Sequence, residues 1–537
     1  MLKQILISCR YYFLEFILFF IDIDFHIQLK YYSNLNYAKK YADFCFQLRL
    51  YKKSISIYKK IIHKKPSDTI TLLKLANAEL KFGNINDSLE NYKRVLLIDP
   101  NSIDVNINYG KALYKAGRST QAFYFLSKIF ESDLVDFEVF EMLHICGAFN
   151  SNLNFILQNS RNIQSKLFES RKIFSFDFIN NKSITTEHKY NLAIHCSFFN
   201  SKGLEIFFLP ILNEIDRDFF NIILLGNGIS PELHKQYKCE NLSGVSDEDF
   251  IHIAKTYSID ILIDIDGMGS RITRVARVSP IQICYFNYPC TTGSDYMDYF
   301  LADNISIPEE SEKYFTEKIL RLNTSVMSFK YQDNWQRINI SPFFTNGYIT
   351  YGFFGNPEKL NPVLIESWGK ILNNVPNSKL LLVHSLFKSK KTIEYFKDLF
   401  EEFGCNSDSL IFVKGKTYNK LLNYYNKIDI ALDPFPYNGG HTTMECLNLG
   451  VPIVSFVGSS YTGRHGIDFF AYLPFTDLLV YSKEEYIERN IYLGTNPLFL
   501  NNLRKELPLL VKSSSLTNIK FAGNEWNRVL KNVLNVF

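Results

Sequence analysis

The sequence predicts an α-helical repeat followed by two α/β domains, each built on a parallel sheet. Three observations support this. Small residues near the N-terminus recur with a fixed period, apolar strands alternate with helices from Lys189 onward, and the alternation begins again near Thr350. The 537 residues are too many for one core. We therefore expect five parts: an apolar helical segment 1–34, a repeat 35–133, a helical connector 134–186, a first sheet domain 187–345 and a second sheet domain 346–537 with terminal helices.

The first part contains an apolar run from Tyr11 to Ile21. Charged residues bound or interrupt the run, and it is shorter than the roughly 20 apolar residues that a membrane helix needs. No small-residue cleavage site follows it, as a signal peptide would require. We expect a helix packed on the next domain. A segment lying on a membrane surface and a cleaved or anchoring signal remain alternatives.

Residues 35–133 repeat with a period of 34 residues. The equivalent positions are Ala42, Ala76 and Gly110; Ser54, Ser88 and Ala122; Tyr58 and Tyr92; Pro66 and Pro100; Gly83 and Gly117. Small residues at helix crossings and a proline after the second helix are typical of tetratricopeptide repeats. Such arrays offer a concave surface to peptides or partner proteins, although so short an array also suits a structural cap. The connector 134–186 reads as mostly helical, without a clear period.

The first sheet domain is predicted from short apolar runs separated by helical stretches. We expect strands at 190–195, 220–225, 259–265, 278–286 and 299–302, with helices at 203–215 and 247–257. The second domain repeats the pattern. We expect strands at 349–354, 379–384, 410–413, 428–432 and 453–457, helices at 362–375, 391–403 and 419–427, and a largely helical stretch 482–536. Two doubly wound domains in tandem place a ligand-binding crevice between them.

The most informative stretch is 428–454, where a strand ends at Asp433 and a glycine turn leads into a helix. Gly439 and Gly440 supply the turn, His441 to Thr443 can cap the helix, and Met444 to Leu449 form it. The free amides and the dipole at such a helix start suit a phosphate. Glu445 lies one turn after His441 and is placed to accept hydrogen bonds from ribose hydroxyls. An ordinary strand–helix connection is the alternative.

Other polar residues are candidates for chemistry. Asp264 and Asp266 end a strand, as in some metal sites, but no third ligand is evident. Lys359 follows a strand and precedes a helix, so it can neutralise a diphosphate or lie solvated on the surface. His195 ends the first strand and faces the expected crevice, unless it is a buried structural histidine. The turn-rich stretch 287–299 reads as a functional loop.

Composition excludes several classes of protein. The net charge is only +4, with 59 basic and 55 acidic residues interspersed, which gives no argument for a nucleic-acid partner. Nine cysteines without a C-x-x-C pair argue against disulfides and zinc and favour a reducing, cytoplasmic location. P-loop, HExxH and G-x-S-x-G sequences do not occur.

Together these segments resemble glycosyltransferase family 41, the family of O-linked N-acetylglucosamine transferases and Spindly-type protein fucosyltransferases. The order of repeat and sheet domains is similar. The matching stretches are NYPCTTGSDYMDYFLAD from Asn287, NPEKLNP from Asn356, DPFPYNGGHTTMECLNLGVPIV from Asp433 and VGSSYTGRHG from Val457. The resemblance covers about residues 35–535.

The resemblance implies a GT-B pair of Rossmann-like domains after the tetratricopeptide repeats. It implies inverting, metal-independent transfer of a sugar, N-acetylglucosamine first, from a nucleotide diphosphate to Ser or Thr hydroxyls of proteins held by the repeats. No cofactor beyond the UDP-sugar or GDP-sugar donor and no membrane partner are expected. Lys359 falls on the diphosphate-contacting lysine and Glu445 on the ribose-binding acidic residue. The remaining implied contacts are Asn356, Gly439, Gly440, His441, Thr442 and Thr443 for the nucleotide, and Tyr288, Pro289, Thr291, Thr292 and Gly293 for the substrate.

Some positions depart from the family pattern. Ser201 stands where the family has a histidine, Asn287 replaces the first glycine of its GYP, and Asn356 replaces a glutamine. An ungapped count from Glu445 places His441 on a threonine of the family. These departures leave three alternatives open: GDP-fucose as donor, a non-protein acceptor, and an interaction scaffold whose sugar site has decayed. No residue stands out as the general base.

Overall fold

The computed structural model describes residues 35–131, 137–148, 153–169, 189–267, 270, 272, 277–337, 340–415 and 417–536. The apolar segment expected at 1–34 lies outside these residues. No helix among the described residues is long and apolar enough to cross a membrane. The chain divides into two compact units, one made of residues up to 116 with 124–133, the other of residues 117–123 with 134–537.

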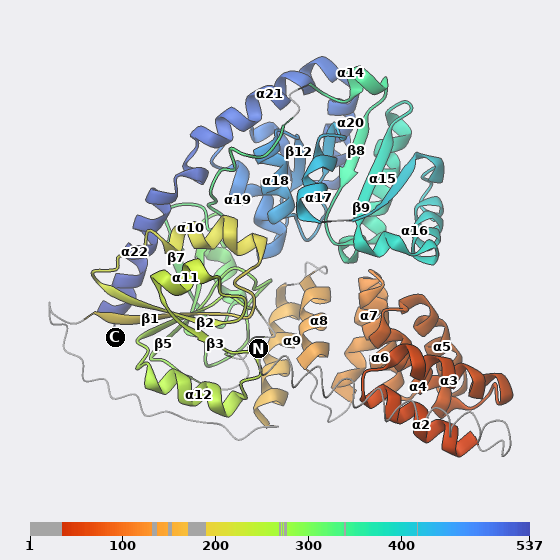
Figure 1. Ribbon diagram of the computed structural model, residues 1–537. Coiled ribbons are helices and arrows are strands. Elements are labelled where there is room, and N and C mark those ends of the chain that lie inside the picture. The colour runs from red at the N-terminus through yellow and green to blue at the C-terminus, as the bar shows by residue number, and fades with distance from the viewer. Residues whose placement is uncertain are drawn as a thin grey trace. The chain divides into compact units, whose positions relative to one another are not determined.

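The first unit is built from antiparallel helices of the repeat (Figure 1). The helices of the repeat are α2 (Leu35–Gln47), α3 (Tyr51–Lys64), α4 (Thr69–Phe82), α5 (Ile85–Ile98), α6 (Ile103–Lys115) and α7 (Ser119–Leu126). Every second helix begins 34 residues after its counterpart, at Leu35, Thr69 and Ile103, so the predicted period is a structural one. The small residues at equivalent positions inside the helices, Ala42, Ala76, Ser54, Ser88 and Ala122, are buried, which lets paired helices approach closely. At Gly110 a methyl group would lie 2.8 Å from Cγ of Leu126.

The second unit contains the described part of the connector and both sheet domains. The connector contributes α8 (Phe137–Ala148) and α9 (Leu153–Glu169). The first sheet has seven parallel strands in the order β3-β2-β1-β4-β5-β6-β7. Its strands are β1 (Tyr190–Cys196), β2 (Phe220–Gly226), β3 (Lys238–Asn241), β4 (Ile261–Asp264), β5 (Ile281–Cys284), β6 (Tyr299–Asp303) and β7 (Lys318–Leu322). Helices α10 (Leu209–Leu212), α11 (Pro231–Gln236) and α12 (Asp247–Thr256) belong to this domain.

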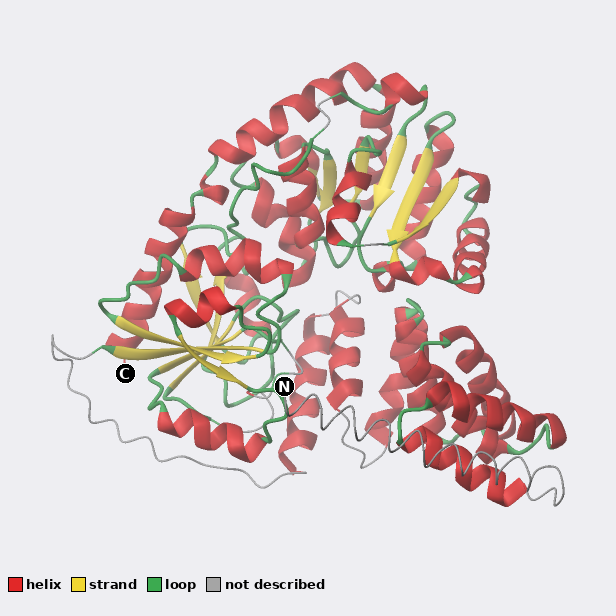
Figure 2. Ribbon diagram, in the orientation of Figure 1, coloured by secondary structure: helices red, strands yellow, loops and turns green. Residues whose placement is uncertain are grey.

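The second sheet has six parallel strands in the order β10-β9-β8-β11-β12-β13. Its strands are β8 (Thr350–Phe353), β9 (Lys379–His384), β10 (Leu410–Lys414), β11 (Ile430–Leu432), β12 (Ile453–Phe456) and β13 (Leu479–Val480). Its helices are α14 (Phe343–Asn346), α15 (Pro362–Asn374), α16 (Lys390–Glu402), α17 (Tyr418–Tyr425), α18 (His441–Leu449), α19 (His465–Phe470), α20 (Lys483–Thr495) and α21 (Pro497–Ser513). The last helix of the chain is α22 (Ile519–Val536). Figure 2 shows the strands of both sheets in yellow, with helices on their faces.

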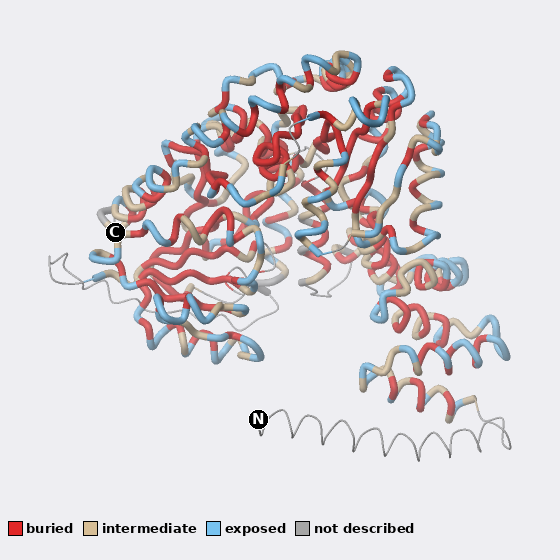
Figure 3. Tube along the Cα trace, turned by 45° about the horizontal axis from the view of Figure 1, so that its top comes forward, coloured by how far each residue is buried: buried red, intermediate tan, exposed pale blue. Residues whose placement is uncertain are grey.

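Burial explains why these strands read as continuous apolar runs. The central strands β4, β5 and β6 of the first sheet and β8 and β11 of the second are buried along their whole length (Figure 3). A parallel sheet covered on both faces has no solvent side, so its strands are mainly apolar, and the buried polar residues in them, such as Asp264 and Gln282, are hydrogen-bonded. The predicted fold class, a helical repeat followed by two Rossmann-like domains, is confirmed.

Three strands escaped prediction because they lie at the sheet edges or are very short. β3 has the sequence KCEN and β13 has two residues, while β7 lies at the sheet edge and has only its last residue, Leu322, buried. The helix expected at 203–215 is broken into a π-helix, Leu204–Phe208, and the short α10, where Pro210 lacks an amide to donate. The helix expected from Met444 begins three residues earlier, at His441.

The last helix, α22, packs against α10 and β7 of the first sheet domain. Lys531 forms an ion pair with Asp216 at 2.6 Å, and the Asn527 side chain accepts from the amide of Asp216 at 2.9 Å. Trp526 is buried against Phe208 and Tyr285. The last helix thus returns to the first domain, whereas α20 and α21 pack within the second domain, where the sequence predicts all the terminal helices.

Candidate functional site

The strand order places one switch point in each sheet. In the first sheet β1 and β4 are neighbours, and the chain moves away from them in opposite directions; in the second sheet β8 and β11 have this relation. Ligands of doubly wound sheets bind at the carboxyl ends of such strand pairs. A cavity of about 720 Å³ lies there, between the two sheet domains. Its lining includes Cys196, Ser197, Phe198, Ser201, Gly203, Leu204, Asp266, Ser270, Phe286, Asn287 and Met327 from the first domain, and Asn356, Lys359, Tyr437, Gly440, His441 and His465 from the second.

Lys359 is the cation of this cavity. It ends a short 3-10 turn after β8, and its Nζ donates to the carbonyl of Asn438 at 2.7 Å and lies 4.0 Å from the centre of the Tyr437 ring. Burial lowers the pKa of Lys359 to about 8, and the charges of Asp433 and Glu358 oppose that shift. The carboxylate of Asp433 is also buried, which raises its pKa. The ammonium group is therefore held desolvated and ready to face an anion.

The glycine turn after β11 leads directly into α18. The Gly439 amide donates to Asp433 at 2.7 Å, and Thr443 Oγ1 donates to the Gly439 carbonyl at 2.9 Å. A Cβ at Gly439 would lie 2.5 Å from Thr443 Oγ1, so the turn needs glycine here. Gly440 caps the helix through its backbone alone. The first amides of α18 have no acceptor inside the helix and start at the cavity wall, next to Lys359.

Glu445 lies behind this wall. Its side chain is 1% exposed, accepts a hydrogen bond from the hydroxyl of Tyr425, and has Oε1 at 3.6 Å from Nε2 of His441. Tyr418 stacks on His441 with the ring planes 9° apart, and its hydroxyl lies 3.3 Å from the same Nε2. The carboxylate thus lies beside His441, which lines the cavity. Of the other nucleotide contacts expected from sequence, Asn356 and Gly440 line the cavity, and Thr442 and Thr443 lie in the first turn of α18.

The first domain contributes a polar cluster at the ends of β1 and β4. His195 pairs with Asp264 in the strand register, and its Nδ1 lies 2.9 Å from Asp264 Oδ1. The Tyr288 hydroxyl donates to the other oxygen of Asp264. Asp266 accepts from the amide and the hydroxyl of Ser197, each at 2.5 Å. His195 is 2% exposed and lies behind the cavity, while Asp266 and Ser197 line it.

His195 is the third potential metal ligand, which the sequence alone did not reveal. One donor atom each of His195, Asp264 and Asp266 lies within 4.8 Å of the others, a separation compatible with a metal ion. However, Asp264 and Asp266 already accept hydrogen bonds from His195, Tyr288 and Ser197. The arrangement is that of a closed hydrogen-bond network that positions Asp266 at the cavity wall.

The residues expected to bind substrate in the loop after β5 lie inside the fold. Tyr288, Pro289, Thr291, Thr292 and Gly293 are all buried, and none lines the cavity. The two threonine hydroxyls donate to Glu317, and α9 covers the loop, with Ser160 Oγ donating to the Thr291 carbonyl at 3.3 Å. A Cβ at Gly293 would lie 2.6 Å from the backbone of Ser160. From these positions the residues support the cavity wall formed by Phe286 and Asn287.

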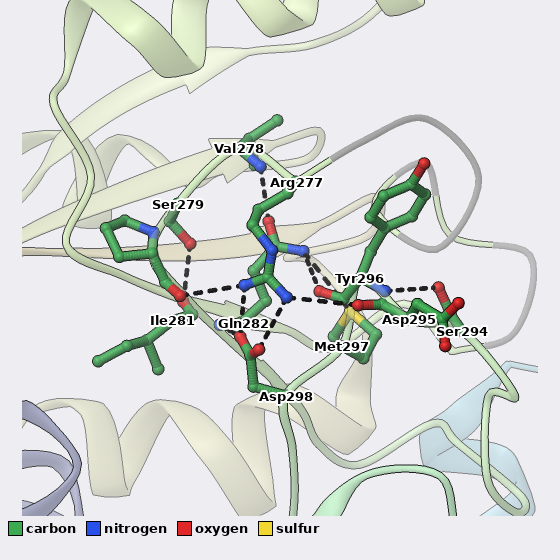
Figure 4. A network of polar contacts seen from close by, with 11 residues as sticks. Arg277, Val278, Ser279, Ile281, Gln282, Ser294, Asp295, Tyr296, Met297 and Asp298 are labelled. Atoms are coloured by element: carbon green, nitrogen blue, oxygen red, sulfur yellow. Dashed lines mark hydrogen bonds and ion pairs between the residues drawn. The ribbon is translucent and has the colours of Figure 1, made fainter. Parts of the chain in front are cut away.

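The end of the same loop is held by the network shown in Figure 4. The guanidinium of Arg277 donates to both oxygens of Asp298, at 2.7 and 2.8 Å. The backbone N–H of Gln282 also donates to Asp298, at 2.8 Å. The Gln282 side chain in turn donates to the Tyr296 carbonyl at 2.7 Å. Asp298 therefore fixes the path of the chain between β5 and β6.

Sequence reasoning missed His465 and Tyr437 as cavity residues. His465 opens α19, far along the chain from the glycine turn, and is 8% exposed. Both of its ring nitrogens are buried without a hydrogen-bond partner among the described residues. Both residues lie in stretches that resemble the family, Tyr437 in DPFPYNGG and His465 in VGSSYTGRHG, and this resemblance is the signal that could have found them.

Comparisons with known proteins agree with this architecture. A probable UDP-N-acetylglucosamine–peptide N-acetylglucosaminyltransferase SPINDLY of Petunia hybrida is 28% identical over 289 residues, which are 53% of this chain and 31% of that relative. The corresponding SEC protein of Arabidopsis thaliana is 28% identical over 305 residues, covering 54% of this chain and 30% of the relative. The matched region is thus about a third of the length of these curated relatives.

A solved structure and a family model extend the comparison. A mutant of the Thermobaculum terrenum O-GlcNAc transferase superposes with a TM-score of 0.75 at 18% identity, covering 93% of this chain and 99% of that one, which shows a common fold. The model of glycosyl transferase family 41 matches residues 242–338 and 343–525, more than half of the chain and most of both sheet domains. The chain belongs to glycosyl transferase family 41.

Proposed function

We propose that this protein transfers a sugar, N-acetylglucosamine in the first place, from a nucleoside diphosphate to Ser or Thr hydroxyls of a protein. The observation that carries the proposal is the position of Lys359 beside the first turn of α18 in the cavity between the sheets. A half-buried ammonium and a row of free amides together suit a diphosphate. The names of the relatives favour UDP-N-acetylglucosamine as donor and a peptide as acceptor.

The proposed chemistry is a single displacement. The acceptor oxygen attacks the anomeric carbon, the bond from that carbon to the diphosphate oxygen breaks, and the diphosphate leaves with the electron pair, so the configuration inverts. Negative charge grows on the leaving diphosphate, and stabilisation must act there. Lys359 and the amides of Thr442 and Thr443 would provide it without a metal ion. Preorganised donors of this kind contribute roughly 3 kcal/mol each in comparable sites.

His441 and Glu445 would hold the nucleoside. The resemblance implies that Glu445 binds the ribose hydroxyls. Its carboxylate lies behind the cavity wall, so it would act on them through His441, which lies 3.6 Å away and lines the cavity. Comparing the affinities of UDP and 2′-deoxy-UDP in wild type and in Glu445→Gln tests this role. If Glu445 acts on the ribose, the substitution should weaken the binding of UDP more than the binding of 2′-deoxy-UDP.

A second function remains of interest because Ser201, at the cavity wall, stands in place of the family histidine. Loss of that histidine suits a protein that binds nucleotide without turning it over and uses its repeats to hold a partner. The repeats serve either function, as an acceptor-binding surface or as a scaffold.

Calorimetric titration of the purified protein with UDP and GDP, in the presence of a chelator, tests the proposal. We expect one nucleotide to bind in wild type and to bind more weakly in Lys359→Ala. Donor hydrolysis and glycosylation of a peptide library then separate the transferase from the scaffold. If the protein binds neither UDP nor GDP, the transferase function is contradicted. If it binds a nucleotide but transfers no sugar to any acceptor tested, the scaffold function is favoured.

A further inference from the structure

His465 is the one side chain of the cavity wall, among the described residues, whose hydrogen-bonding groups are all buried and all unpaired. Its exposed fraction is 8%, so solvent does not replace the missing partners. A buried polar group without a partner destabilises the folded protein. Such a group within a ligand cavity needs an explanation, and a ligand that completes its hydrogen bonds is one.

The ring cannot turn away to find other partners. It is packed edge-on against Tyr461, with centroids 5.2 Å apart, and against Tyr437 at 6.0 Å. Tyr437 carries Lys359 on its ring, so His465 and Lys359 share a neighbour. A methyl group built on Gly440 would lie 3.7 Å from Nδ1 of His465, which places this nitrogen beside the cap of α18.

The ring is neutral in this setting. Burial and the charge of Lys359 lower the pKa of His465 to about 3. A neutral imidazole has one N–H donor and one acceptor nitrogen. Its complement is a ligand that offers a hydrogen-bond acceptor and a hydrogen-bond donor within a few ångströms of each other.

The junction of a sugar nucleotide meets that description, because a phosphate oxygen accepts and a sugar hydroxyl donates. We infer that His465 bridges the donor substrate, donating one ring N–H to the diphosphate and accepting a hydrogen bond from a hydroxyl of the transferred sugar. The inference rests on the proposed function, since it takes a nucleoside diphosphate at Lys359 and α18 as given. His465 would thus contact both the transferred sugar and the leaving diphosphate.

The test compares UDP, UDP-N-acetylglucosamine and uridine by calorimetry in wild type, His465→Phe and His465→Gln. Phenylalanine keeps the aromatic packing and removes both nitrogens, while glutamine keeps one donor and one acceptor. Each neutral hydrogen bond contributes about 0.5–1.5 kcal/mol, equivalent to about 2- to 13-fold in affinity. We therefore expect His465→Phe to bind UDP several-fold more weakly, to bind the sugar nucleotide more weakly still, and to bind uridine as wild type does. His465→Gln should lie between.

Thermal unfolding without ligand separates this role from a structural one. His465→Phe removes two unpaired buried nitrogens, so its melting temperature should equal or exceed that of wild type. His384→Phe is the matched control, because Nδ1 of His384 accepts from the amide of Leu386 at 3.3 Å outside the cavity. That control should lose stability and keep nucleotide affinity.

The outcomes are distinct. If wild type binds neither UDP nor UDP-N-acetylglucosamine, the proposed function fails and the bridge fails with it. If wild type binds both and His465→Phe binds them equally well, only the bridge is overturned. Equal losses for the two nucleotides, or a loss for the sugar nucleotide alone, would also overturn it, because each would show that the ring contacts only one side of the junction.

Discussion

Lys359 donates a 2.7 Å hydrogen bond to the backbone carbonyl of Asn438, although the two residues are 79 positions apart. The bond joins the loop after β8 to the turn after β11, and a second bond of 2.8 Å, from Asn361 to the Phe435 carbonyl, reinforces it. The lysine is therefore held at the switch point of the second sheet before any ligand arrives. This preorganisation is the basis of the first two predictions.

Replacing the lysine should remove most of the activity while leaving the fold intact. We expect Lys359→Ala to lower turnover by about two to three orders of magnitude, because one preorganised cation at the leaving group is lost. Steady-state kinetics of donor hydrolysis or transfer measure the effect. Lys370→Ala, on the exposed side of α15, is the control and should keep wild-type turnover. Wild-type turnover in Lys359→Ala would rule out the proposed role.

Affinity for a diphosphate should fall as the pH rises. Burial lowers the pKa of Lys359 to about 8, so the ammonium is present below that pH and lost above it. If binding needs the charged form, the dissociation constant for UDP should increase by up to about tenfold per pH unit above the pKa. Calorimetry from about pH 6.5 to about pH 9.5 measures this trend. Any titration of UDP itself affects wild type and Lys359→Ala equally, and the variant lacks the lysine. An equal slope of the dissociation constant against pH in the variant would therefore contradict the assignment.

The buried carboxyl of Asp468 should make stability depend on pH. Burial and the nearby charge of Asp303 raise the pKa of Asp468 well above its usual range. The folded state therefore holds a proton that the unfolded state releases, and this residue's contribution to stability falls as the pH rises above the unfolded value of about 4. We expect Asp468→Asn to be more stable than wild type, with a larger gain at pH 8 than at pH 5, by thermal unfolding. An equal gain at both values would show that the carboxyl does not titrate in this way.

The hydrogen bond between Tyr425 and Glu445 should appear as an energetic coupling. Both side chains are almost completely buried, so either single substitution, Tyr425→Phe or Glu445→Leu, leaves its partner unpaired and should cost about 1–3 kcal/mol. The double variant replaces both polar groups and should be less destabilised than the sum of the single variants. Denaturant unfolding of the four proteins gives the coupling energy. Simple additivity would mean that the two groups do not interact in solution.

Close packing of the repeat should make Gly110 intolerant of a side chain. A Cβ there would lie 2.8 Å from Leu126 Cγ and 3.0 Å from the Leu126 amide nitrogen, so Gly110→Ala should destabilise by about 1–3 kcal/mol despite the better helix propensity of alanine. Gly147, in α8, is the control, since its nearest atom would be 3.9 Å away. Gly147→Ala should be neutral or stabilising in thermal unfolding. A stable Gly110→Ala would show that the helices can separate without cost.

Much of the fold follows from local patterns in the sequence. The small residues at a 34-residue spacing come from helices that begin 34 residues apart, and buried central strands such as β5 appear as apolar runs. Edge strands were missed because exposure on one side lets them carry polar residues, as in β3. The return of α22 to the first sheet was also invisible, because an amphipathic helix does not specify which apolar face it covers.

Residues of the site could be anticipated where they lie close in sequence, or where the family resemblance marked them, as at Lys359. The turn and helix from Gly439 to Thr443 are contiguous, so their free amides could be anticipated. The partnership of His195 with Asp264 arises from strand pairing between positions 69 apart, and nothing in either local stretch encodes it. His465 reaches the cavity only after β12 and the following turn fold back, so its unpaired ring emerges from the three-dimensional arrangement alone.

The return of α22 also has a consequence for biosynthesis. A ribosome completes the first sheet early, yet the helix that buries Phe208 and Tyr285 against Trp526 is translated after the entire second domain. During elongation this apolar face stays uncovered, and transiently exposed apolar surface of this kind promotes aggregation. A premature stop before Ile519 would leave the face permanently open, so truncated products should be targets of quality control rather than smaller active proteins.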